Sequence, residues 1–92
     1  RPYLREPDPV ALKGVDRLQG RLVLRNDGMA TAHVQISSAD ARLSVSRDQV
    51  EVKQDKSVRI SIVWEDPEPP PSQLYLDIVS DVGQWRVPVS RQ

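Results

Sequence analysis

The sequence predicts an all-β fold, a two-sheet antiparallel immunoglobulin-like β-sandwich of seven or eight strands. Short runs of alternating apolar and polar residues recur at intervals of roughly 8–12 residues, which is typical of sandwiches. Valine, a β-branched residue that packs well on a pleated sheet, occurs 13 times in 92 residues. No segment shows helical spacing of apolar residues over three turns. A small closed barrel is the alternative that the same spacing allows.

Alternation predicts eight strand segments, and the two strongest are the second and the sixth. In chain order they span residues 10–12, 17–25, 31–37, 41–46, 50–53, 57–64, 74–79 and 85–89. Leu22 and Leu24 share the inward phase of the second segment, and Ile60 and Ile62 share that of the sixth. These four side chains are therefore predicted to lie at the centre of the core.

The connection between the second and third segments is Asn26-Asp27-Gly28. These residue types tolerate the positive φ angles that tight turns demand, so the sequence predicts a turn here. Two geometries remain open. The turn closes a hairpin within one sheet, or it forms an arch that carries the chain over the core to the opposite sheet.

Proline marks the boundaries of the pattern. Residues 1–8 read as a linker or lead-in, and residues 9–92 as one immunoglobulin-like β-sandwich domain excised from a larger protein. Residues 65–72 hold four prolines and predict a loop between strands. Pro88 predicts that the last strand lies at a sheet edge or leaves towards a following domain.

Charge and composition exclude several classes of function. The 13 basic and 13 acidic residues balance, so the chain lacks the long-range positive field that would attract nucleic acids or anionic membranes. No run approaches the ~18 apolar residues of a membrane span, and the start does not resemble a signal peptide. Cysteine is absent, so no disulfide or thiolate chemistry is expected. The compartment stays unknown, with a slight preference for the cytoplasm.

The sequence carries no constellation for catalysis, for a metal or for a cofactor. His33 is the single histidine and has the outward phase of its strand, so it is expected to be a solvated surface residue. The carboxylates occupy turns and outward positions, where ordinary pKa values are expected. Phosphate-binding glycine motifs and the nucleophile elbow are missing. The prediction is a protein that is not an enzyme and that has no cofactor.

Candidate interaction residues are arginines and one tyrosine. Arg21 and Arg25 share an outward face with Arg17, and Arg59 joins them if its strand lies beside theirs. Tyr75 also has the outward phase, and it would form an apolar patch with three valines if all four share a sheet. Those valines are Val23, Val63 and Val79. The competing interpretation of the arginine face is a solvated sheet surface neutralised by nearby carboxylates.

Two further features have competing interpretations. Pro67-Glu68-Pro69-Pro70 has the spacing of a polyproline ligand, but a stiff loop between strands explains it better. Asp and Asn residues in several turns could gather into a calcium site, although ordinary turn chemistry accounts for them.

The segment Leu24-Arg25-Asn26-Asp27-Gly28, with the long strand from Val58 to Trp64, resembles immunoglobulin-like domains of the hydin and major-sperm-protein (ASH-type) superfamily. The resemblance covers roughly residues 9–89 and rests on a strand followed by an Asn-x-Gly turn. It departs from the family where Trp64-Glu65-Asp66-Pro67 replaces the usual Phe-x-Pro. It implies a non-enzymatic module that binds proteins or spaces domains.

The function predicted from the sequence is a non-catalytic protein-interaction or spacer module, an accessory domain of a multidomain protein. Its partner would be a neighbouring domain of the same chain or an acidic protein, with no nucleic acid and no membrane span. The alternative is a carbohydrate-binding or calcium-binding extracellular β-sandwich, suggested by the turn Asp residues and the two Trp residues.

Overall fold

The computed structural model describes residues 1–92 and contains eight strands, with no helix that could span a membrane. Their bounds are β1 (Val10–Leu12), β2 (Leu18–Arg25), β3 (Ala32–Ser37), β4 (Leu43–Val45), β5 (Gln49–Val52), β6 (Ser57–Trp64), β7 (Leu74–Ser80) and β8 (Gly83–Arg91). All eight segments predicted from the alternation of apolar and polar residues form strands.

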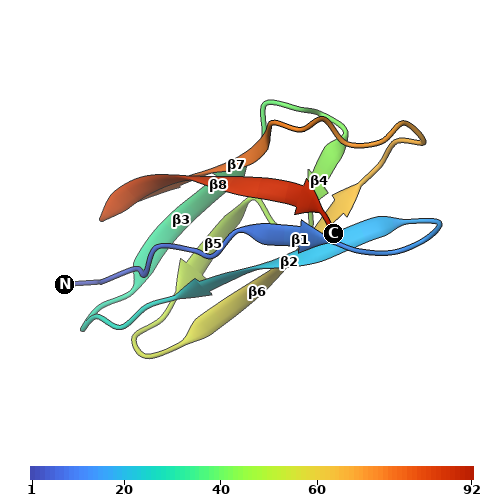
Figure 1. Cartoon of the computed structure of the whole chain (residues 1–92). Coiled ribbons are helices and arrows are strands. Elements are labelled where there is room, and N and C mark those ends of the chain that lie inside the picture. The colour runs from blue at the N-terminus through green and yellow to red at the C-terminus, as the bar shows by residue number, and fades with distance from the viewer.

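The strands form two sheets, which confirms the sandwich and rejects the closed barrel. One sheet has five strands in the order β1-β8-β7-β3-β5, and the other has three in the order β2-β6-β4. All neighbours are antiparallel except β1 and β8, which run side by side in the same direction (Figure 1). The fold is an immunoglobulin-like β-sandwich.

The core lies between the two sheets and is built from the inward phase of each strand. Leu22 stands opposite Ile60 in the ladder between β2 and β6, and neither side chain is exposed. Burial of apolar area at about 25 cal/mol per Å² is the main stabilising contribution here. The predicted inward residues Leu24 and Ile62 are fully buried as well.

The turn at Asn26-Asp27-Gly28 is an arch, because β2 and β3 belong to different sheets. The expected positive φ angles are absent from it, and a positive φ occurs instead at Gly14 and at Asp55. Gly28 is required by close approach. A Cβ there would lie 2.2 Å from the main-chain nitrogen of Tyr3, so only glycine lets the first residues pass.

The first residues lie against the sandwich. Leu4 is 4% exposed and belongs to the core cluster. The main-chain nitrogen of Arg5 donates to the oxygen of Arg25, and the nitrogen of Asp27 donates to the oxygen of Tyr3. Segment 1–8, expected as a linker or lead-in, thus follows the end of β2 before the chain crosses to β8.

The last strand is not an edge strand, so the first of the two alternatives expected from Pro88 is wrong. β8 lies between β1 and β7. Pro88 stands opposite Tyr75 of β7, and β1 begins pairing only at Val89, the partner of Val10. Because the proline nitrogen faces the β1 side just before that strand starts, its missing N–H removes no ladder hydrogen bond.

Candidate functional site

The structure brings three of the four predicted interaction residues onto the outer face of the three-stranded sheet. Arg59 was expected to share a face with Arg21 only if their strands are neighbours, and β2 and β6 do pair. Val23 stands directly opposite Arg59. Arg21 precedes Val23 by two residues, so it shares this face and lies diagonally across from Arg59. Arg21, Val23 and Arg59 are all exposed and form what is here called the arginine face.

The outward positions of β2, β4 and β6 carry no carboxylate. Arg21 and Arg59 form no ion pair with any group of the protein. Five other arginines are ion-paired with carboxylates: Arg5, Arg17, Arg25, Arg42 and Arg86. The guanidinium groups at the arginine face therefore keep their full hydrogen-bonding capacity for another molecule.

Val23 is a neighbour of both guanidinium-bearing side chains, directly across from Arg59 and two residues after Arg21, and it is 46% exposed. The long aliphatic stems of arginine cover apolar surface while their charged ends stay in water. The arginine face thus combines two cations with an apolar spot across adjacent strands. Such a surface matches an acidic segment that carries an apolar side chain.

Arg25 belongs to the same strand but is engaged at the end of the sheet. Its Nε lies 2.9 Å from Oδ1 of Asp27, and its Nη1 donates to the main-chain oxygen of Asp55 at 2.8 Å. Arg5 pairs with the same carboxylate. The hydrogen bond from Arg25, followed by that from Arg5, holds the pKa of Asp27 below its usual range. Arg17 lies outside β2 and pairs with Glu65. Arg17 and Arg25 are therefore both ion-paired within the chain, whereas Arg21 is free to bind another molecule.

Tyr75 does not join these residues, because it lies on β7 of the five-stranded sheet. The guanidinium of Arg86 sits 5.5 Å from the centre of its ring, a cation–π distance. The expected apolar patch is therefore wrong. Val79 shares the sheet of Tyr75, Val23 lies on the other sheet, and Val63 is buried.

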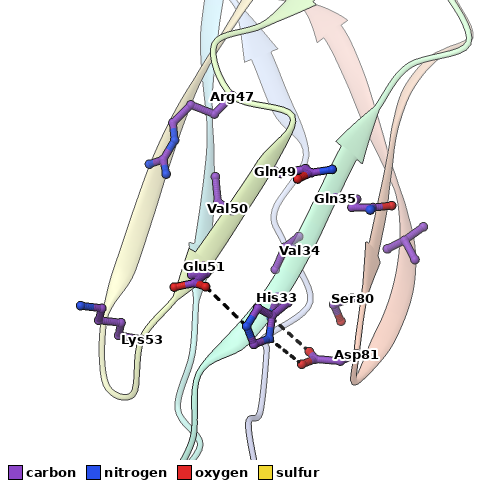
Figure 2. Close-up of a pocket in the computed structure, with 11 residues that line it drawn as sticks. His33, Val34, Gln35, Arg47, Gln49, Val50, Glu51, Lys53, Ser80 and Asp81 are labelled. Carbon is purple, nitrogen blue, oxygen red and sulfur yellow. Dashed lines mark hydrogen bonds and ion pairs between the residues drawn. The ribbon is translucent and has the colours of Figure 1, made fainter.

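A second surface feature, which the sequence did not single out, is a hollow of about 710 Å³ on the outer face of the five-stranded sheet. Residues of β3, of β5 and of the end of β7 line this hollow (Figure 2). His33 lies at its rim between two carboxylates, with Nδ1 3.2 Å from Asp81 and Nε2 3.6 Å from Glu51. Asp81 also accepts a hydrogen bond from the main-chain nitrogen of His33, at 3.2 Å.

These contacts qualify the expectation that His33 is simply solvated. Its side chain is 64% exposed, yet both ring nitrogens face a carboxylate. The hydrogen bond with His33 lowers the pKa of Asp81, so the expectation of ordinary carboxyl pKa values was wrong here. Strand pairing explains the cluster, since His33 stands opposite Glu51 in the ladder and Asp81 follows the last residue of β7. Sequence spacing alone does not show which strands are neighbours.

No group of three or more His, Cys, Asp or Glu side chains is arranged to hold a metal ion. Of the turn residues that suggested calcium, Asp27 pairs with Arg5 and Arg25, Asp81 contacts His33, and Asp66 accepts a hydrogen bond from the main-chain nitrogen of Glu68. Trp64, one of the two residues that suggested carbohydrate stacking, is 4% exposed. Its Nε1 donates to the main-chain oxygen of Glu68 at 2.7 Å, which anchors the proline-rich loop to the core.

Comparison with known proteins supports the fold. No family model matches the chain, and no curated protein matches it. Among solved structures, the chain is similar to the periplasmic chaperone SfaE, with a TM-score of 0.66 and 16% sequence identity over the whole chain. The match covers 56% of the chaperone chain, so the present chain spans about half its length. The immunoglobulin-like fold is confirmed, whereas membership of the hydin and major-sperm-protein superfamily stays a prediction.

Proposed function

We propose that the chain is a non-catalytic protein-interaction module that binds an acidic segment of a partner protein at the arginine face. The observation that carries this proposal is the pair Arg21 and Arg59. Both are exposed, neither forms an ion pair, and both adjoin the exposed Val23. Two cations side by side repel one another, and an anionic partner relieves that repulsion. The solved structure of similar fold is that of a periplasmic chaperone, which supports a role in protein interaction.

The mode of binding follows from the chemistry of the two side chains. Each guanidinium group presents a planar fork of N–H donors that fits a carboxylate in a bidentate arrangement. A partner segment with Asp or Glu residues on both sides of an apolar residue would place that apolar side chain on Val23. Because both arginines are exposed, screening by salt should weaken the complex.

The test is a titration of the domain into a fluorescently labelled peptide. The peptide has one central Leu, and on each side of it Glu residues alternate with Ser. Fluorescence anisotropy at low and at high salt gives the dissociation constant. We expect binding that R21E/R59E weakens at least about tenfold, which corresponds to 1.4 kcal/mol. The matched control R1E/R91E makes the same change of net charge at two other arginines without ion pairs. An equal loss in both variants, or no binding to the unaltered domain, would contradict the proposal.

A further inference from the structure

β5 is the last strand of the five-stranded sheet and pairs only with β3. The main-chain nitrogen of Ile36 donates to the oxygen of Asp48 at 2.8 Å, which marks that pair as hydrogen-bonded. In an antiparallel ladder such pairs recur at every second residue, so Val50 and Val52 also bond towards β3. The N–H and C=O groups of Gln49 and Glu51 consequently point away from the sheet, where another strand could pair with them.

Charged side chains flank this edge with opposite signs. Glu51 lies on β5 itself and is 63% exposed, with its Oε1 3.6 Å from Nε2 of His33. Arg47 precedes β5 by two residues and has no ion pair. Both side chains line the hollow, near opposite ends of the strand, with Gln49 between them (Figure 2). The edge therefore carries Arg47 on one side of Gln49, and Glu51 followed by Lys53 on the other.

We infer that β5 pairs antiparallel with β5 of a second copy of this chain, about a two-fold axis that passes between the two Gln49 residues. In this register the two Gln49 residues exchange main-chain hydrogen bonds. Glu51 then faces the partner's Arg47, and two-fold symmetry makes this ion pair twice. This self-association involves the sheet opposite the arginine face, so it goes beyond the proposed function and does not depend on it.

Charge complementarity favours this register over those centred on Val50 and on Glu51. Because Gln49 and Glu51 carry the outward main-chain groups, antiparallel registers can be centred on Val50, on Glu51 or on Val52. Centring on Val52 pairs Glu51 with the partner's Lys53 but leaves Arg47 beyond the paired strands, and the variant K53E distinguishes it from the proposed register. Centring on Val50 places Arg47 opposite the partner's Lys53, two like charges. Centring on Glu51 places two carboxylates face to face. Like charges directly opposite each other destabilise a strand pair, whereas opposite charges stabilise it.

Sedimentation velocity from micromolar to millimolar concentration measures the association. A strand of four residues offers few main-chain hydrogen bonds, so we expect a reversible dimer that forms towards the upper end of this range. R47E and E51R should each weaken the dimer about tenfold, since either change turns two attractive pairs into two repulsive ones. The double variant R47E/E51R restores both pairs and should dimerise as the unaltered chain does.

Mixing the two single variants gives the sharpest result. R47E places carboxylates at both positions that face each other across the two-fold axis, and E51R places guanidinium groups at both. An equimolar mixture should therefore form a heterodimer, although each variant alone stays mostly monomeric. K53E is the matched control. It reverses a charge beside the same strand, but the proposed register gives Lys53 no charged partner, so dimerisation should not change.

Three outcomes would overturn the inference. They are a chain that stays monomeric throughout, a dimer that both single reversals leave unchanged, and a dimer that K53E strengthens or weakens. Strengthening would indicate the register centred on Val50, and weakening would indicate the register centred on Val52. Unchanged circular dichroism spectra of the variants would show that altered association does not come from unfolding.

Discussion

The side-chain amide of Asn26 and the main-chain oxygen of Val52 join the two sheets through a hydrogen bond of 2.9 Å. Asn26 directly follows β2, and Val52 is the last residue of β5 in the opposite sheet. The same amide donates to the oxygen of Ala30, and its Oδ1 accepts from the main-chain nitrogens of Tyr3 and Gly28. Asn26 is fully buried, and these four bonds satisfy its side chain completely.

Replacing Asn26 with Asp should lower the free energy of unfolding by about 3 kcal/mol or more. The substitution keeps the shape of the side chain, but it replaces the donor that serves Ala30 and Val52 with an acceptor. Two buried carbonyl oxygens would then face a carboxyl group. Urea unfolding monitored by tryptophan fluorescence measures the change. The isosteric control Asp27→Asn alters an exposed side chain next to it and should have a much smaller effect.

Truncation of the central core pair should cost about 2–5 kcal/mol for Leu22→Ala and a similar amount for Ile60→Ala. Both residues are fully buried and stand opposite each other between β2 and β6. Val23→Ala is the control on the same strand, because its side chain is 46% exposed, and it should change stability by no more than about 0.5 kcal/mol. Urea melts in which both core variants lose under about 1 kcal/mol would contradict the packing described here.

The Asp40 carboxyl should titrate far below an ordinary aspartate. Its side-chain hydrogen bonds with the guanidinium of Arg42, followed by one from the Arg42 main-chain nitrogen, lower its pKa to about 2. A pKa that is lower in the folded than in the unfolded state stabilises the fold above the ordinary pKa of about 4. That contribution is lost as the pH falls towards about 2.

Carboxyl chemical shifts followed through an acid titration measure this pKa directly. Asp40→Asn removes the titrating group, so its urea midpoint should fall less steeply over the acid range than that of the unaltered chain. An Asp40 carboxyl that titrates near pH 4 would contradict the expected effect of Arg42.

The sandwich could be predicted because local alternation determines which side chains point inward, and the core formed from those residues. The neighbouring positions of Arg21 and Arg59 followed from the same reasoning once the fold was assumed to be immunoglobulin-like. The structural role of Asn26 could not be predicted in this way. Its residue type suits a turn, but its hydrogen bonds reach Tyr3 and Val52, whose positions depend on the packing of the two sheets.

The position of Tyr75 likewise depends on long-range pairing that the local sequence pattern does not show. Its outward phase was predicted correctly, but phase does not say which of the two sheets a strand joins, and β7 lies in the sheet opposite Val23. The cluster around His33 depends on pairing with β5 and on the turn after β7, and neither is visible in the spacing of single residues.

The central claim is that the arginine face binds an acidic partner segment, and nuclear magnetic resonance mapping with the Glu-containing peptide tests it most directly. Amide shifts of the 15N-labelled domain should change at Arg21, Val23 and Arg59 in proportion to bound peptide. The amides of Tyr75 on the opposite sheet should stay unchanged. Shifts centred on the five-stranded sheet, or no shifts at saturating peptide, would contradict the claim.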